Sequence, residues 1–380
     1  MLSSSTRSEI PPFYVMEVMR AAAEREQAGH RVLHLEVGQP STPAPKGVLE
    51  AAHHALDNDR LGYTGAAGLP ELRERIAQWY RTGYDLTVDP ARIVVTTGAS
   101  GSCVLAFLAA FDPGDRVAVM EPGYPCYRND LLAFGIDVVP LAIGPETNFR
   151  PTVEALDGLG PLDGLVIASP SNPTGTVLDR DHLTVVVEWA KAKGVRLLAD
   201  EIYHGITFEQ PAPTALGIDP DVIVLNSFSK YFSMTGWRLG WVVAPPAIAE
   251  AIERLAQSLT VAPPTLSQLA AMAAFDCTDE LEANVARYGR NRSILLDGLP
   301  AGGFDRLAPA DGAFYVWADV SSIEMGASAL CRRWLDELSI AATPGIDFDQ
   351  VRGEQFVRFS YAGAADDLTE AMTRLGAWRP

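Results

Sequence analysis

The sequence has few cysteines, and they follow no pairing or ligand pattern. Four occur in 380 residues, none of them in a CxxC or zinc-finger spacing: Cys103, Cys126, Cys277 and Cys331. Scattered cysteines of this kind are typical of buried free thiols, so we expect neither a disulfide framework nor a zinc site. A metal enzyme is a remote alternative: His53, His54 and His204 have no i, i+4 histidine partner or clustered ligands, and we expect them to be solvated or capping. No metal is therefore expected.

Positive charge and long hydrophobic runs are also scarce. The chain has 30 Lys and Arg residues against 48 Asp and Glu, which gives a net charge of -18 and an isoelectric point near 4.7. This balance argues against nucleic acid or an anionic membrane as a partner, because binding to either depends on clustered Lys and Arg. The longest obvious apolar run, Val104 to Phe111, is far too short to cross a bilayer, and residues 1–10 lack the apolar core of a signal peptide. We expect a soluble cytoplasmic protein.

What the sequence does contain is a regular alternation of strand-like and helix-like segments. With 48% hydrophobic and 21% charged residues, the chain is an ordinary globular protein, long enough for two domains. Strands are expected at Ile93–Thr97, Arg116–Met120, Gly164–Ala168, Arg196–Ala199, Val222–Leu225 and Leu239–Ala244, and helices between them at Leu69–Arg81, Ser102–Phe111 and His182–Lys193. This order predicts an α/β fold with a largely parallel sheet. The pattern changes near Glu280, where a long helix over Leu281–Leu296 precedes strands at Ala313–Ala318 and Glu354–Tyr361.

The most informative segment is NSFSKYFSMTGWRLGW, residues 226–241. The apolar run before it reads as a buried strand, so Lys230 should lie just past a strand's carboxyl end, where open α/β sheets bind ligands. A lysine there, with Ser227 and Arg238 near a phosphate, suits a Schiff base with an aldehyde cofactor that carries a phosphate. Ser-x-Ser-Lys alone is common in surface loops, but the full string favours the functional interpretation.

This segment resembles the lysine region of the fold type I pyridoxal-phosphate (PLP) enzymes, in particular the aspartate aminotransferase-like class I/II aminotransferases. The resemblance covers nearly the whole chain, and it implies PLP as the cofactor. It also implies a large α/β domain, residues 45–280, with a mainly parallel seven-stranded sheet flanked by helices. A smaller α+β domain would be discontinuous, formed by residues 1–44 and 281–380.

Asp200 directly follows the nearly apolar segment 195–199, at the end of an expected strand. A buried carboxylate is costly unless it is paired, and a lone Asp at a strand end most often caps a following helix. Beside Lys230, the resemblance implies instead that ionised Asp200 keeps the PLP pyridine nitrogen protonated, so that the ring can act as an electron sink. It also implies that Tyr203 donates its hydroxyl to the ring phenolate oxygen. Lys230, Asp200 and Tyr203 are the predicted catalytic residues.

A run of small residues, TTGASGS at 96–102, joins a strand to a helix. Free backbone amides of Gly98, Ala99 and Ser100 at the positive end of that helix would bind the phosphate, with Arg238 completing the charge balance. Gly and Ser are also ordinary helix starts. No GxxxxGK[ST] or GxGxxG fingerprint follows a strand here.

Two further motifs follow strands. SPSNPTG at 169–175 predicts a turn in which either X-Pro bond could be cis. Turn geometry alone accounts for most such strings, but its resemblance to the family's N-P-x-G turn implies that Asn172 donates a hydrogen bond to the same phenolate oxygen. Tyr124, in Glu121-Pro122-Gly123-Tyr124-Pro125, would stack on the pyridine ring, although a packed tyrosine would look identical.

The stretch that contains Tyr63 is similar to the family's Y-x-x-x-x-G-x-x-x-L-R stretch. In the family this tyrosine reaches the phosphate of the neighbouring subunit, which implies a homodimer with shared active sites.

The substrate prediction rests on Arg358 and Gly38. An arginine that alternates with apolar residues along a strand is usually a surface charge or a salt-bridge partner. The resemblance implies that Arg358 binds the substrate α-carboxylate bidentately, with the Gly38 backbone and Asn172 close by. Lys230 could then reach the α-proton.

These residues together predict ping-pong transamination between an L-amino acid and a 2-oxo acid. Some relatives carry a lysine near Ser100 that reads a distal carboxylate, and this chain has Ser100 and Gly101 there. If Ile10, Phe13 and Tyr14 line the pocket, it would accept apolar or aromatic side chains, although a packed N-terminal helix is equally consistent. We therefore expect a broad or apolar and aromatic side-chain range.

Two alternatives compete with this prediction, and the second is the more remote. A PLP-dependent C–S β-lyase has the same fold and the same Lys, Asp and Arg set. A transcriptional regulator with an aminotransferase-like effector domain would need a basic helix-turn-helix domain, for which a nearly whole-chain resemblance leaves no room.

Overall fold

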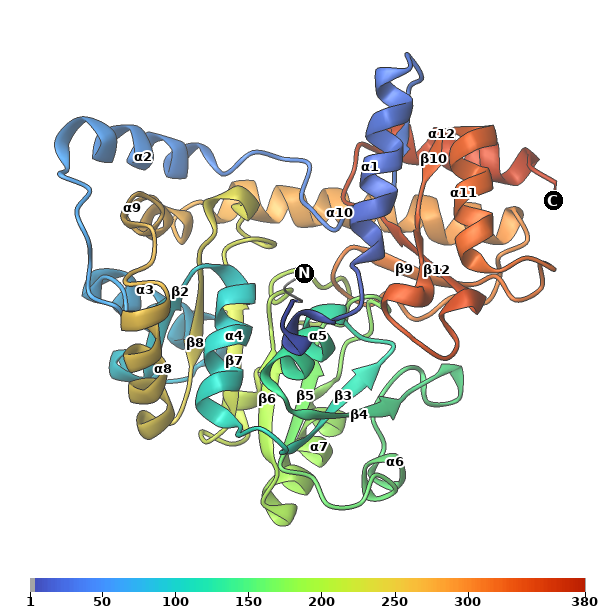
Figure 1. The fold of residues 1–380 in the computed structure, drawn as a ribbon. Coiled ribbons are helices and arrows are strands. Elements are labelled where there is room, and N and C mark those ends of the chain that lie inside the picture. Colours follow the sequence, from blue (N-terminus) through green and yellow to red (C-terminus); the bar gives the residue numbers. More distant parts are fainter. Residues whose placement is uncertain (1–3, 380) are drawn as a thin grey trace.

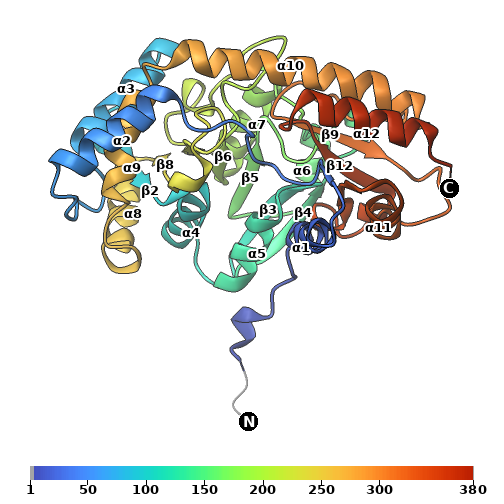
Figure 2. The same ribbon diagram turned by 90° about the horizontal axis from the view of Figure 1, so that it is seen from above.

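A computed structural model describes residues 4–379 (Figures 1 and 2). The helices are α1 (Tyr14–Gln27), α2 (Lys46–Asn58), α3 (Pro70–Tyr84), α4 (Gly98–Ala110), α5 (Pro125–Phe134), α6 (Val153–Asp157), α7 (Arg180–Lys193), α8 (Pro246–Leu259), α9 (Thr265–Ala274), α10 (Thr278–Ala301), α11 (Ala327–Leu338) and α12 (Ala365–Ala377). The strands are β1 (Leu33–His34), β2 (Ile93–Thr96), β3 (Arg116–Glu121), β4 (Asp137–Ala142), β5 (Gly164–Ala168), β6 (Arg196–Asp200), β7 (Ile223–Ser227), β8 (Gly240–Val243), β9 (Tyr315–Asp319), β10 (Ile340–Ala341), β11 (Thr343–Pro344) and β12 (Phe356–Ser360).

A seven-stranded sheet in the order β2-β8-β7-β6-β5-β3-β4 forms the centre of the larger part of the molecule. Strand β8 runs antiparallel to both of its neighbours, and the other pairings are parallel. The predicted α/β fold with a mainly parallel sheet is therefore confirmed.

Both faces of this sheet are buried. Val94, Val166 and Leu198 pack on the side that carries α4, α5 and α8. The residues beside them in the chain, such as Leu165 and Leu197, point to the opposite core with α3, α7 and α9. Because successive strand residues face opposite sides and helices cover both, the strands read as continuous apolar runs.

The C-terminal part has its own sheet, in the order β11-β12-β9, packed with α10, α11 and α12. The N-terminal segment joins it, because β1 pairs in parallel with β10. Figure 1 shows α1 beside this C-terminal part, with α10 extending across the molecule toward α9. The division into residues 45–280 against 1–44 and 281–380 stays a prediction.

The predicted elements differ from the observed ones mainly at their ends. The long helix begins at Thr278 rather than Leu281, and α4 begins at Gly98, so the small-residue segment forms its first turn. Strand β4 was not anticipated. It lies at the sheet edge and contains Pro140, which an edge strand tolerates because one row of its backbone groups is unpaired.

The cysteines, the helices and the clustering of possible metal ligands complete the description of the fold. All four cysteines are free thiols, with Cys103 and Cys331 buried. Within residues 4–379, no helix is long and apolar enough to span a membrane, and no three His, Cys, Asp or Glu side chains gather in a group that could hold a metal ion.

Candidate active site

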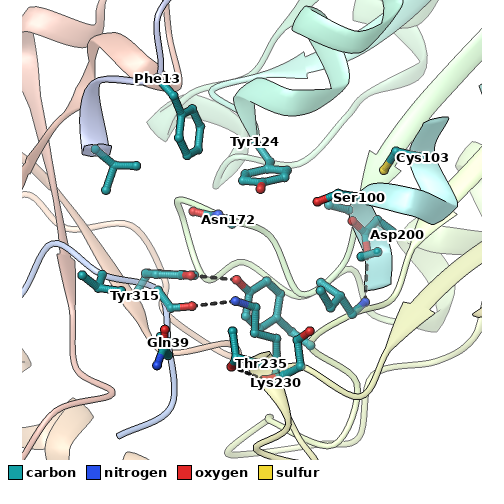
Figure 3. A pocket seen from close by; sticks show the side chains of 18 of the residues that line it. Phe13, Gln39, Ser100, Cys103, Tyr124, Asn172, Asp200, Lys230, Thr235 and Tyr315 are labelled. Atoms are coloured by element: carbon teal, nitrogen blue, oxygen red, sulfur yellow. Dashed lines mark hydrogen bonds between the residues drawn. The ribbon is translucent and has the colours of Figure 1, made fainter. Parts of the chain in front are cut away.

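A cavity of about 310 Å³ opens at the carboxyl ends of the parallel strands. Predicted residues that line it come from segments far apart in the sequence: Gly38, Ala99, Ser100, Tyr124, Asn172, Asp200, Tyr203, Lys230, Arg238 and Arg358. Figure 3 shows Phe13 and Tyr124 on one side of the cavity and Lys230 and Thr235 on the other. The cavity lies where the topology of an open α/β sheet leads one to expect a ligand.

Lys230 follows the end of β7 by three residues and points into the cavity. Its Nζ donates a hydrogen bond to the Gly38 carbonyl oxygen at 2.6 Å. Burial lowers the pKa of the Lys230 amine to about 8, with Arg358 and Arg238 acting in the same direction and Asp200 opposing them. A lysine held in this way has a larger neutral fraction near physiological pH than an ordinary lysine, which suits a nucleophile.

Asp200 is the last residue of β6 and is 3% exposed. Its carboxylate accepts hydrogen bonds from the Tyr127 hydroxyl and from the Ile202 amide, the latter at 2.9 Å. Burial raises the pKa of Asp200, while these two donors and Lys230 oppose that rise. No helix starts directly after Asp200, so it does not act as a helix cap. The carboxylate faces the cavity and can still bind a cationic group there.

The first turn of α4 forms a cavity wall with the features of an anion site. No side chain caps the start of this helix, so its first amides lack side-chain acceptors. Arg238 lies beside them: a Cβ placed on Gly98 would come within 2.4 Å of Arg238 Nη2. Glycine is therefore required where the guanidinium meets the helix start, and amides, dipole and cation together suit a phosphate.

Two tyrosines and an asparagine surround the middle of the cavity. The Tyr203 and Tyr315 hydroxyls lie 2.7 Å apart, an interaction that Figure 3 draws as a dashed line. Burial raises the pKa of Tyr203, which keeps its phenol protonated and able to donate a hydrogen bond into the cavity. Asn172 follows β5 in a turn whose Ser169-Pro170 and Asn172-Pro173 bonds are both cis.

Arg358, on β12, is 4% exposed, yet in residues 4–379 it makes no ion pair. Its Nη1 donates to Asn172 Oδ1 at 3.0 Å, its Nη2 donates to the Glu36 carbonyl oxygen, and its Nε has no hydrogen-bond partner in the described chain. The Tyr315 and Phe348 rings lie 4.5 and 4.7 Å from the guanidinium carbon. A buried cation held only by neutral groups and aromatic rings favours a carboxylate ligand.

Three predicted residues do not line the cavity. Gly98 packs against the guanidinium of Arg238. Tyr63 is 89% exposed in the loop between α2 and α3. Ser227 is buried and donates to the Leu239 carbonyl oxygen at 3.0 Å. Ser229, whose Oγ lies 2.9 Å from that of Ser227, lines the cavity wall in its place.

Other cavity residues were missed by the sequence analysis. Tyr127, Tyr315, Gln39, Thr235 and Cys103 line the wall, as do Val15, Met16 and Met19 of α1. Tyr127 carried a weak signal, because it lies three residues after Tyr124 at the start of a helix. His204 was wrongly expected to be solvated or capping: it is buried, its Nδ1 lies 2.7 Å from the Tyr84 hydroxyl, and burial lowers its pKa to about 3.

The fold and cavity together define an α/β protein whose cavity gathers a lysine amine of lowered pKa, a helix start without a side-chain cap and a buried guanidinium. The family model for aminotransferase class I and II matches residues 30–375. The chain belongs to this family, whose members are generally PLP-dependent.

Comparisons with individual proteins agree. The chain is 49% identical over 379 residues, 98% of each sequence, to a valine–pyruvate aminotransferase of Mycobacterium tuberculosis. A solved structure of an aminotransferase from M. tuberculosis has a TM-score of 0.97 at 48% identity, covering 100% of this chain and 99% of that chain. The aspartate aminotransferase of Thermus thermophilus with maleate has a TM-score of 0.93 at 32% identity, covering 99% of both. The predicted family, fold class and aminotransferase function are confirmed.

Proposed function

We propose that this aminotransferase uses PLP to move an amino group between an L-amino acid with an apolar side chain and a 2-oxo acid, by a ping-pong mechanism. The observation that carries the proposal is the buried guanidinium of Arg358, which has no ion-pair partner in the described chain and lies in the same cavity as Lys230. A substrate carboxylate on Arg358 and a reacting amine near Lys230 are what amino acid chemistry requires.

The cavity residues fit PLP. The amides of Gly98, Ala99 and Ser100, with Ser229 and Arg238, would hold the phosphate, and Tyr124 would cover one face of the ring. The carboxylate of Asp200 would pair with the pyridine N–H, and Tyr203 and Asn172 would donate to the phenolate oxygen. When bound, PLP supplies an aldehyde for the amino group and a ring that delocalises the electrons of the broken Cα–H bond.

The remaining steps belong to this chain's own side chains. Arg358 would grip the substrate carboxylate through its free N–H groups, which fixes the direction of the Cα–H bond. The Lys230 amine would take the α-proton, because its pKa of about 8 lets it accept and return a proton near neutral pH. Asn172 accepts from Arg358 through its Oδ1, and its side-chain amide N–H would donate to the phenolate oxygen, so that it would link Arg358 to the cofactor.

The lining residues support an apolar substrate side chain. Phe13, Val15, Met16, Met19 and Val37 contribute apolar surface beside Arg358. The cations that line the cavity in residues 4–379 are Lys230, Arg238 and Arg358, and each already has a proposed partner in the reaction. This chain therefore offers an acidic side chain no further cation. The valine–pyruvate activity of the M. tuberculosis relative is of the same kind.

We further propose that the enzyme works as a homodimer in which Tyr63 reaches the phosphate site of the neighbouring subunit. The proposal is supported by the 89% exposure of Tyr63 in the single chain, which leaves its ring free for a partner. The amino and oxo acid substrates follow from the family itself.

The test is a single turnover of the PLP-loaded protein, followed by visible absorbance, with valine, leucine, phenylalanine, aspartate and alanine as donors. Loss of the absorbance of the aldehyde form, restored by pyruvate and without ammonia, would support ping-pong transamination. Faster conversion by valine or leucine than by aspartate would support the apolar range. Steady ammonia release with unchanged absorbance would instead indicate an eliminating lyase.

A further inference from the structure

A second buried charged group lies beside the carboxylate site. Glu36 is 0% exposed, and its Oε2 has no hydrogen-bond partner within residues 4–379. Its Oε1 accepts a hydrogen bond from His34 Nδ1 at 2.8 Å. Removing a carboxylate from water without a cation or sufficient donors is costly. His34 therefore provides the charge balance for Glu36.

His34 also reaches a different element. Its Nε2 lies 3.1 Å from Oε1 of Glu26, which belongs to the last turn of α1. A protonated imidazole donates from both nitrogens, so it can hold both carboxylates at once. The hydrogen bond with Glu36 is the main reason why the pKa of His34 is raised to about 9; burial opposes this rise, and Glu26 adds to it.

The other charged groups near β1 have partners of their own. On α12, Asp367 and Glu370 pair with Arg31. On α1, Arg25 donates to Ser339 Oγ at 3.1 Å. Strand β10, which pairs with β1, consists of Ile340 and Ala341 and so brings no charged side chain. In the described part of the chain, the charged groups that contact His34 are therefore Glu26 and Glu36.

The backbone at Glu36 continues directly into the active site. The Glu36 carbonyl oxygen accepts hydrogen bonds from Arg358 Nη2 and from Thr343 Oγ1, the latter at 3.0 Å. Two residues on, the Gly38 carbonyl oxygen accepts from Lys230 Nζ. Anchoring the Glu36 side chain thus fixes two carbonyl groups that hold Arg358 and Lys230.

We propose that Glu26, His34 and Glu36 form a positioning chain that holds the backbone of residues 36–38 for Arg358 and Lys230, and so sets the affinity for the substrate carboxylate. The same chain ties the last turn of α1, whose first turns line the cavity, to the carboxylate site. The inference rests on the proposed role of Arg358.

The experiment measures binding of 3-methylbutanoate, an apolar carboxylate without an amino group, to the PLP-loaded protein by calorimetry. H34N, which removes the charge of His34, is expected to weaken binding about tenfold at pH 7, the effect of one charge-assisted hydrogen bond. R31Q is the matched control: it breaks the exposed ion pairs three residues away and is expected to bind within about twofold of wild type. Equal affinity of H34N and wild type would overturn the proposal.

Two further variants separate the possible failures. If R358Q binds the carboxylate as well as wild type, the proposed role of Arg358 fails, and this inference fails with it. If R358Q weakens binding and H34N does not, only the inference is overturned. Should H34N not fold, E26Q is the variant to test. Binding by the wild type should weaken at high pH as His34 loses its proton. In E26Q this loss should occur at lower pH, because Glu26 helps to raise the pKa of His34. Superimposed profiles of E26Q and wild type would overturn the proposal.

Discussion

At the scale of single residues, the cavity holds its cations with neutral groups rather than with carboxylates. Lys230 donates to a carbonyl oxygen, and Arg358 donates to an amide and a carbonyl oxygen. The cations therefore repel one another, which contributes to the lowered pKa of Lys230. Such an arrangement destabilises the empty cavity and favours anionic ligands, as expected where a site binds both a phosphate and a carboxylate.

The lowered pKa of Lys230 predicts how the cofactor-free protein captures PLP. Only the neutral amine attacks an aldehyde, so the capture rate should rise with pH and level off above about pH 8. At pH 6 the neutral fraction should be about 100-fold smaller than the plateau. Stopped-flow measurement of the absorbance band that forms when Lys230 reacts with PLP gives this rate, and K230R should form no such band. A rate that keeps rising steeply to pH 10 would indicate an ordinary lysine and contradict the prediction.

The hydrogen bond from Tyr127 to Asp200 should affect how activity depends on pH on the acid side. The Tyr127 hydroxyl donates to Asp200 and lowers the pKa of that carboxyl against the effect of burial. Y127F should therefore raise the pKa of Asp200 and reduce kcat/KM about tenfold, with a larger loss at low pH. Y80F is the control, because the Tyr80 hydroxyl contacts Trp241 behind the sheet. Equal losses at pH 6 and pH 9 would argue against this role.

At the scale of elements, α1 is held by groups from elsewhere in the chain. Its N-cap residue, Phe13, makes no side-chain cap, and the Asp347 carboxylate accepts instead from the Tyr14 and Val15 amides, both at 2.8 Å. An acidic group at this end also complements the helix dipole. Since Met16 and Met19 of α1 line the cavity, this distant cap helps to form the wall that we propose for the substrate side chain.

Removing the distant cap should affect substrate binding more than chemistry. D347A is expected to cost about 1 kcal/mol of helix stability, which corresponds to about a fivefold rise in KM for valine. The value of kcat should change less, because Asp200 ends β6 and Lys230 follows β7, so that neither belongs to α1. D336N, an exposed change near the other end of α1, should leave KM unchanged. Steady-state kinetics measures both variants, and a fall in kcat without a rise in KM would contradict this role of α1.

At the scale of the whole molecule, the main prediction concerns shared active sites. Tyr63 lies outside the cavity of its own chain, in the loop between α2 and α3. If it completes the phosphate site of a second subunit, each site needs residues from two chains.

Hybrid dimers test this directly. K230A and Y63A should each be impaired, but their mixed dimer contains one site with both native residues and should regain activity after subunit exchange. K230A mixed with D200A is the control, since Lys230 and Asp200 line the same cavity of one chain and neither hybrid site would be native. Activity is measured as pyruvate-dependent turnover of valine. No gain for the first mixture would show that Tyr63 does not act across subunits.

The strands that lead to the cavity were predictable, because each is an apolar run that ends in residues of distinctive chemistry. Lys230 and Asn172 follow β7 and β5, Asp200 ends β6, and carboxyl ends of parallel strands meet at one edge. The choice between Ser227 and Ser229 was not predictable from the motif. It depends on which way each side chain points at the end of β7, where Ser227 turns toward the Leu239 carbonyl oxygen.

The amino-acid sequence by itself determined the class of fold and the chemical groups of the site, because periodicity and strand-end motifs are local properties of the chain. The tertiary structure decided which distant segments complete that site. Tyr127 meets Asp200, Asp347 caps α1, and Arg358 meets the carbonyl of Glu36, each across 73 to 333 residues of sequence. No local pattern specifies such contacts, because they arise from the packing of separate helices and strands against one another.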